Sequence, residues 1–262
     1  MRRLKDLIPL KSLEIHLMPI ARFRARHHLC LSEVIGFEAL ARGPMETALA
    51  DPQRLFEKAR EEGLEEELDL ECIRRALLQL DRLSPHLELH INIRPATLSH
   101  TKFRRRLLTE VAPAERHRVV LEVPPPELRG DKTYKRRLKN LRADGFRVAL
   151  DELRGDDEDI DRLRWAGRFD YVHVGRHFMD NALTRPLDHT LGWLREVRVL
   201  TDRFNGEIVL EGIRAESVPL LGPISKQGIV LGQGHLFGPP VAALGPTARR
   251  QLREAMEYDN GA

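Results

Sequence analysis

Eight short apolar or alternating runs divide the chain in the way expected of strands separated by helices. They cover residues 13–20, 34–40, 87–94, 119–123, 146–150, 171–175, 207–210 and 229–231. Most of these runs end at a turn or at a breaker, and most are followed by a helical pattern. Strand and helix alternating over about 250 residues favours an α/β fold, a single (β/α)8 barrel.

The segments between these runs carry helix signals. Apolar residues recur on one face of residues 64–83 and 188–204, and Asp51 before Pro52 is a typical helix start. Further helices are predicted at residues 97–111, 132–143, 156–164 and 215–226, with a closing helix at 247–257. Residues 21–33 are polar and are predicted to form a loop or a hairpin.

A doubly wound open sheet is the alternative architecture. Its glycine-rich dinucleotide fingerprint is missing, because the glycine-dense stretch at residues 232–238 has the wrong spacing and lies late in the chain. No composition shift marks a domain boundary, so we expect one domain over residues 1–262 with its core at about 13–240. The barrel is therefore the preferred prediction.

Composition and charge narrow the function classes. Of the 262 residues, 42% are hydrophobic and 32% charged, and the net charge of +3 is too evenly spread to predict DNA binding. Cys30 and Cys72 are far apart and predict no disulfide framework. The N-terminal residues are too polar for a signal peptide, and no apolar run reaches membrane-spanning length. We therefore expect a cytoplasmic protein without a membrane partner.

Candidate chemistry gathers where the predicted strands end. The polar residues at or near these ends are Glu38, Asn92, Glu122, Asp151, Glu152, His173, Glu211 and Gln233. The strand ends of a barrel converge on one mouth, and several carboxylates meeting there repel one another unless a cation neutralises them. Oxygen donors of this kind suit Mg²⁺ or Mn²⁺. Arg42, which follows Glu38 closely, could grip a phosphate.

The order of these residues resembles that of the EAL family, the cyclic di-GMP phosphodiesterase domains of bacteria. GFEALAR resembles the motif that names the family, and the later family motifs resemble LHINIRPATL, LEVPP, VALDEL, YVHVGRHFM, LEGIRAE and GQGHLFGPP. The resemblance covers roughly Leu13 to Pro240. It implies a modified TIM barrel with an antiparallel first strand. It also implies a two-metal site that opens cyclic di-GMP to linear pGpG.

The resemblance also implies residue roles. The metal ligands would be Glu38, Asn92, Glu122 and Asp151, and the substrate-binding residues would be Arg42 and Gln233. Glu152, His173 and Glu211 fall at catalytic positions. Two of these three depart from the family pattern. His173 replaces a lysine that helps to position the attacking water, and Glu152 replaces the second aspartate of a pair.

Further departures surround the second-metal position. Gly175 stands where the family has an aspartate, Pro125 and Arg214 stand where glutamates are usual, and Met18 replaces a common substrate-contacting glutamine. All four residues that would bind the first metal are present, whereas most residues that would bind the second metal or position the water are replaced. The leading hypothesis is a degenerate EAL domain that binds cyclic di-GMP at the barrel mouth or acts through protein contacts, with weak or no hydrolysis.

Two alternatives remain open. The first is an active phosphodiesterase in which His173 serves as base or metal ligand and Glu152 holds the second ion. The second is a protein-binding adaptor that no longer uses nucleotide. Family members often dimerise, so a homodimer and a protein partner are both compatible with the sequence.

Overall fold

The computed structural model describes residues 8, 12–25, 29–100, 102–126 and 131–242. The closing helix predicted at residues 247–257 lies outside these residues. In the described part of the chain, no helix combines the length and the apolar character needed to cross a bilayer.

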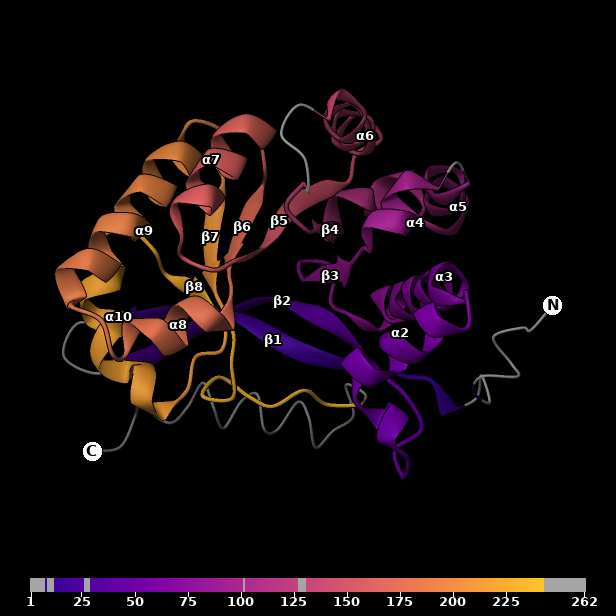
Figure 1. Cartoon of the computed structure of the whole chain (residues 1–262), viewed down its shortest axis with the longest axis horizontal. Coiled ribbons are helices and arrows are strands. Elements are labelled where there is room, and N and C mark those ends of the chain that lie inside the picture. Colours follow the sequence, from indigo (N-terminus) through magenta and orange to yellow (C-terminus); the bar gives the residue numbers. More distant parts are fainter. Residues whose placement is uncertain (1–7, 9–11, 26–28, 101, 127–130, 243–262) are drawn as a thin grey trace.

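The described strands close into an eight-stranded barrel in which sequence neighbours are also spatial neighbours (Figure 1). The strands are β1 Glu14–Ala25, β2 Leu29–Arg42, β3 Glu88–Asn92, β4 Val119–Val123, β5 Arg147–Leu153, β6 Tyr171–Val174, β7 Glu207–Leu210 and β8 Leu231–Gly232. β1 runs antiparallel to both of its neighbours, β2 and β8. The other neighbouring pairs, from β2–β3 to β7–β8, are parallel. The prediction of a modified TIM barrel with an antiparallel first strand is confirmed.

The first two strands are longer than the sequence pattern indicated. Residues 21–25 and 29–33, predicted as a loop or a hairpin, belong to the paired arms of a β1–β2 hairpin. Alternate side chains of a strand point in opposite directions, so the polar residues of these segments lie on the outer face. These polar residues masked the strand pattern in the sequence. Phe23 is fully buried and lies 5.9 Å from Phe237 between ring centroids, whereas Arg24 on the other face is exposed.

From β2 onward, helices connect successive strands and pack on the outside of the barrel (Figure 1). They are α2 Pro52–Glu61, α3 Glu65–Leu77, α4 Pro95–Ser99, α5 Phe103–Glu110, α6 Lys132–Ala143, α7 Asp157–Ala166, α8 Arg176–Ala182, α9 Leu187–Asp202 and α10 Val218–Ser225. Short 3-10 turns occur at η2 Ala48–Ala50, η3 Leu80–Arg82, η4 Pro113–Arg118 and η5 Ala215–Ser217. The predicted start of α2 is confirmed, since the Asp51 carboxylate accepts a hydrogen bond from the Gln53 amide at 2.8 Å.

Other elements also differ from the sequence prediction. The helix predicted at residues 97–111 is split into α4 and α5, because His100 adopts an extended conformation that ends α4. The helix α8 was not predicted, since its seven residues are too few to show a helical period. The last strand, β8, lies at the C-terminal edge of its predicted range.

The barrel interior has an apolar layer beneath a polar one. The apolar layer comprises Ile20, Val120, Ala149, Tyr171, Val209 and Leu231, all buried. A second and larger apolar core lies between the sheet and the helices. Because side chains alternate along each strand, the next inward position toward the mouth of several strands falls in the polar layer. The fold therefore presents polar side chains to the mouth.

Candidate functional site

Residues that are distant in sequence meet at the mouth around Glu38. Asn92 Nδ2 donates to Glu38 Oε1 at 2.7 Å, and Gln233 Nε2 donates to Glu38 Oε2 at 2.7 Å. The same Gln233 nitrogen lies 3.1 Å from Glu211 Oε1. The barrel thus brings together side chains from the ends of β2, β3, β7 and β8. The sequence analysis expected these strand ends to converge on one mouth.

A glycine turn fixes the position of Gln233. Gly234 has φ +153°, and a Cβ atom at this position would lie 2.1 Å from the carbonyl oxygen of Ile213. A side chain there would force the two segments apart. The close approach also allows the Ile213 amide to donate to the Gln233 carbonyl at 3.0 Å, which holds the glutamine over the mouth.

His173 lies beneath the carboxylates and is fully buried. Its Nδ1 atom is 2.9 Å from Glu211 Oε1, 3.4 Å from Glu122 Oε1 and 4.0 Å from Asp151 Oδ1. The structure therefore gathers four of the predicted residues, contributed by β4, β5, β6 and the end of β7.

The crowded carboxylates are shifted toward their neutral forms. Burial raises the pKa of Glu122 and of Glu211 well above the usual value, and neighbouring acidic groups add to the shift. The pKa of Asp151 rises to about 8, first because the carboxyl is withdrawn from water and then because Glu211 lies nearby. Without a counter-charge these groups cannot all ionise together, so the site is suited to a cation.

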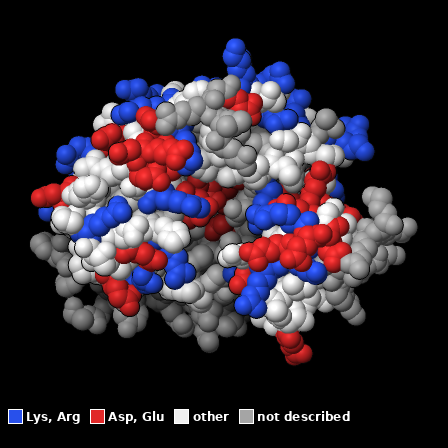
Figure 2. All heavy atoms as spheres, in the orientation of Figure 1, with Lys and Arg blue, Asp and Glu red and all other residues white. Residues whose placement is uncertain are grey.

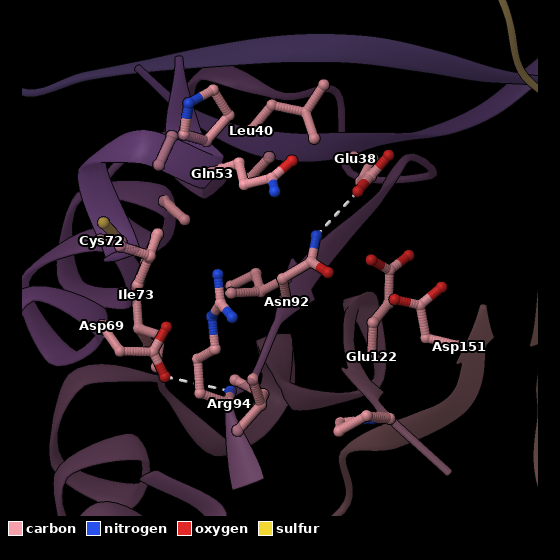
Figure 3. A pocket seen from close by; sticks show the side chains of 18 of the residues that line it. Glu38, Leu40, Gln53, Asp69, Cys72, Ile73, Asn92, Arg94, Glu122 and Asp151 are labelled. Atoms are coloured by element: carbon pink, nitrogen blue, oxygen red, sulfur yellow. Dashed lines mark hydrogen bonds between the residues drawn. The ribbon is translucent and has the colours of Figure 1, made fainter. Parts of the chain in front are cut away.

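A cavity of about 580 Å³ opens at the mouth of the barrel (Figures 2 and 3). Its lining includes the predicted residues Glu38, Arg42, Asn92, Glu122, Asp151 and Glu152. Acidic side chains lie at the bottom of the recess in Figure 2, with lysine and arginine beside them. On the side of α2, the Arg94 guanidinium lies 4.1 Å from the centroid of the Phe56 ring. The cavity therefore offers oxygen donors and cationic groups, and the buried Phe56 ring supports Arg94.

Glu152 stands apart from the other carboxylates. It has φ +56°, which is unusual for a residue other than glycine, and its side chain is 55% exposed. Its Oε1 atom pairs with Arg154 at 3.3 Å. The structure thus places Glu152 at the rim of the cavity, outside the group formed around Glu38 and His173.

The first-metal set fits a hard divalent cation. Glu38, Asn92, Glu122 and Asp151 offer carboxylate and amide oxygens, the donors that Mg²⁺ and Mn²⁺ prefer. Among the described residues, Glu122 Oε2 is buried and has no hydrogen-bond partner. An uncompensated carboxylate oxygen in a dry interior is costly, and a bound cation would remove that cost.

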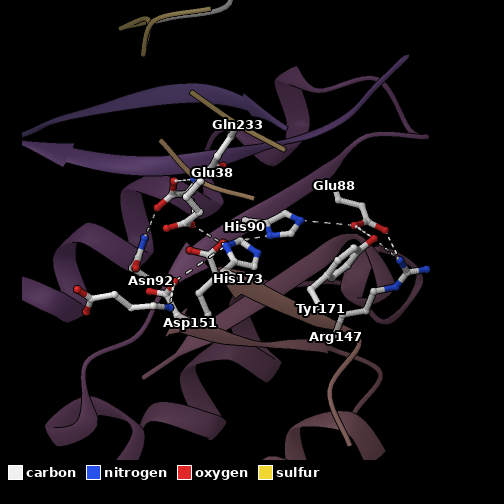
Figure 4. Close-up of polar contacts among 12 residues, drawn as sticks. Glu38, Glu88, His90, Asn92, Arg147, Asp151, Tyr171, His173 and Gln233 are labelled. Atoms are coloured by element: carbon white, nitrogen blue, oxygen red, sulfur yellow. Dashed lines mark hydrogen bonds and ion pairs between the residues drawn. The ribbon is translucent and has the colours of Figure 1, made fainter. Parts of the chain in front are cut away.

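Sequence reasoning missed two inward polar residues, Glu88 and His90. His90 is fully buried, and its Nδ1 atom lies 3.1 Å from Glu122 Oε1 (Figure 4). The signal was present in the alternation of β3, because Glu88, His90 and Asn92 occupy every second position and so share a face. Because Asn92 faces the mouth, His90, two residues earlier in the same strand, is expected to point into the barrel.

A barrel whose parallel strands end in polar groups around an open cavity belongs to the class of barrels that bind their ligands at this mouth. The model of the EAL domain family matches residues 2–240, and the chain belongs to this family.

Solved structures share the fold at low sequence identity. The EAL enzyme Bd1971, bound to cAMP and cyclic di-GMP, has a TM-score of 0.76 and 19% identity over 94% of this chain, which spans 66% of that protein. The phosphodiesterase PaMucR in complex with c-di-GMP has a TM-score of 0.74 and 22% identity, covering 92% and 96% of the two chains. BlrP1 of Klebsiella pneumoniae, a manganese and c-di-GMP complex, has a TM-score of 0.69 and 21% identity over 91% and 58%. No curated protein matches this chain.

Proposed function

We propose that this chain binds cyclic di-GMP at the mouth of the barrel and hydrolyses it weakly or not at all. One contrast carries the proposal. The oxygen ligands of the first cation and Arg42 line the open cavity, whereas His173 is fully buried beneath them. The proposed binding groups thus border the cavity, whereas the side chain expected to position the water is not part of its lining. The c-di-GMP complexes of PaMucR and BlrP1 support the choice of ligand.

The proposed cation is Mg²⁺ or Mn²⁺, held by Glu38, Asn92, Glu122 and Asp151. Bound there, it would neutralise the carboxylates and offer a positive charge to a phosphate oxygen. Arg42 would hold the same phosphate through two parallel hydrogen bonds, and Gln233 would keep Glu38 in place from the opposite side. The manganese in the BlrP1 complex supports a cation of this type.

Weak hydrolysis follows from the three positions that would serve the second cation and the water. The His173 imidazole contacts Glu211 at 2.9 Å and does not reach the cavity surface. Gly175 has no side chain, and Glu152 is turned toward Arg154 at the rim. Losing the group that orients the nucleophile lowers the rate far more than it lowers binding.

The test combines binding with turnover. Purified protein is incubated with cyclic di-GMP and Mn²⁺, bound and free nucleotide are separated, and both fractions are analysed by chromatography. We expect intact cyclic di-GMP in the bound fraction. Metal-dependent accumulation of pGpG would instead establish the second candidate, an active phosphodiesterase. Intact nucleotide found only in the free fraction would indicate an adaptor. A homodimer, a protein partner and a cytoplasmic location remain predictions from the sequence.

Restoring the family residues should increase turnover. In the double variant His173→Lys/Gly175→Asp, we expect hydrolysis of cyclic di-GMP to rise at least ~10-fold while affinity stays within about threefold. The backbone leaves room for a Cβ atom at Gly175, which would meet its nearest neighbours at 3.4–3.5 Å. Steady-state kinetics would give kcat and KM separately. Gly175→Ala is the control, and equal rates in the double variant and the control would contradict this explanation.

Arg42→Lys should weaken binding of cyclic di-GMP by about tenfold, or ~1.4 kcal/mol. Lysine keeps the charge but loses the planar fork that matches two phosphate oxygens. Isothermal titration calorimetry in Mn²⁺ would measure the change. Arg54→Lys is the matched control, since Arg54 lies on α2 and is exposed outside the lining of the cavity. An equal loss of affinity in the two variants would remove Arg42 from the binding site.

A further inference from the structure

Beneath the proposed mouth site lies a cluster of which the proposed function uses only Glu122, as a ligand of the mouth cation. It consists of His90 on β3, Glu122 on β4 and His173 on β6, with exposures of 0%, 1% and 0% (Figure 4). The two imidazoles approach the same carboxylate oxygen. His90 Nδ1 lies 3.1 Å and His173 Nδ1 3.4 Å from Glu122 Oε1.

We propose that this cluster is a separate site for a transition-metal cation, with Zn²⁺ as the representative ion. Zinc bonds to imidazole nitrogen and carboxylate oxygen are about 2.1 Å long, so neighbouring ligand atoms around one ion lie roughly 3.0–3.4 Å apart. The distances of 3.1 and 3.4 Å to Glu122 Oε1 match this spacing. One candidate donor atom from each of His90, Glu122 and His173 falls within 4.8 Å of the other two.

Unpartnered nitrogen atoms in the same cluster bear on the tautomers of the two histidines. Among the residues that the structure describes, His90 Nε2 and His173 Nε2 are buried without hydrogen-bond partners. A neutral imidazole has one N–H group and one lone pair. If His90 Nδ1 donates to Glu122 and His173 Nδ1 donates to Glu211, both Nε2 lone pairs stay unpaired in a dry interior, which costs free energy. A cation bound by the Nδ1 lone pairs instead moves the protons to Nε2.

The proton on His90 Nε2 then faces a suitable acceptor. Glu88 Oε2 lies 3.6 Å from His90 Nε2, and the Tyr171 hydroxyl donates to that oxygen at 2.8 Å. Arg147 pairs with the other oxygen of Glu88. Histidines that bind metals usually donate their second ring nitrogen to a carboxylate, which fixes the tautomer and the ring orientation. Glu88 and its two partners provide this arrangement on the side of His90 away from Glu38 (right side of Figure 4).

The donor set distinguishes this site from the one at the mouth. Two imidazole nitrogens favour Zn²⁺ or Fe²⁺ over Mg²⁺, which prefers oxygen. Glu211 Oε1, at 2.9 Å from His173 Nδ1, is in reach as a fourth donor. Glu122 also lines the mouth cavity, so this carboxylate lies between the two proposed sites. With Oε1 facing the histidines, Glu122 Oε2 remains available to the cation at the mouth.

The test uses metal alone, so its result does not depend on the cyclic di-GMP proposal. Zn²⁺ affinity and stoichiometry are measured by competition with a chromophoric chelator, in the presence of excess Mg²⁺ to occupy the mouth. We expect His90→Gln to weaken the tightest Zn²⁺ equivalent at least ~100-fold, and Glu88→Gln to weaken it about 10- to 100-fold. The matched control is His86→Gln, an exposed histidine just before β3, which should change nothing.

A measurement on the unaltered chain keeps the proposal falsifiable if a buried variant does not fold. In protein labelled with ¹⁵N-histidine, Zn²⁺ should shift the Nδ1 resonances of two buried rings while excess Mg²⁺ leaves them in place. Zn²⁺ bound without a change in any ring nitrogen would overturn the proposal. So would a tight Zn²⁺ equivalent that survives in folded His90→Gln but is lost in Glu38→Gln, since that ion would sit at the mouth.

Discussion

Glu38→Gln is expected to weaken cation-dependent binding of cyclic di-GMP by at least ~100-fold. Glu38 is the central acceptor of the mouth, since both of its oxygens take hydrogen bonds, from Asn92 and from Gln233. Glutamine has the same shape but lacks the negative charge. Its amide nitrogen would also face a donor, which breaks one of the two hydrogen bonds and removes one cation ligand at once.

Calorimetry with Mn²⁺ alone and then with cyclic di-GMP would separate these two losses. We expect both affinities to fall together if the cation connects the protein to the phosphate. Glu57→Gln is the matched control, because Glu57 lines the same cavity outside the ligand set. Binding of the nucleotide that survives in Glu38→Gln at full strength would show that it does not depend on this cation.

The metal-free protein is expected to lose thermal stability as the pH rises from 6.5 to 9. The pKa of Asp151 is raised to about 8, so the folded state holds this proton over a range in which the unfolded chain has released it. Stability therefore falls as the pH increases toward 8, the reverse of the usual behaviour of a salt-bridged aspartate. We expect Tm to drop by roughly 3–6 °C over this interval.

Two additions to that experiment identify the cause. Asp151→Asn should reduce the alkaline loss of Tm, because the group that would ionise beside Glu211 is gone, and it should also weaken binding of Mn²⁺. Saturating Mn²⁺ should raise the Tm of the unaltered protein more at pH 9 than at pH 6.5. Asp157→Asn, an exposed position in the first turn of α7, should behave like the unaltered protein. A Tm that rises with pH in the metal-free protein would contradict the proposed cause.

Stability and function are thus expected to respond oppositely at Asp151. Without a cation, the charged form of the Asp151 carboxylate is unfavourable because the group is buried beside Glu211. The same charge would stabilise a bound cation, so the residue lowers stability and supports binding. Glu122 and Glu211 share this character, since burial also raises their pKa values well above the usual range.

The barrel itself was readable from local pattern. The strand β4 consists of five buried residues, and β3 alternates strictly between polar and apolar residues. Both strands can therefore be predicted from their own side chains. The ends of the β1–β2 hairpin were not readable in the same way. Their charged residues lie on the solvent face, and pairing between Arg24 and Cys30 is a property of two strands together.

The sequence by itself determined the chemistry available at the mouth, because the inward-pointing side chains at the ends of the parallel strands of a barrel face the mouth. It placed Glu38, Asn92 and Asp151 there before any contact was known. Only the tertiary structure decided which groups are exposed and which are buried. It turned Glu152 toward solvent and withdrew His173 beneath the carboxylates. It also set His90 against Glu122, a contact fixed by the register in which β3 pairs with β4, which no local pattern encodes.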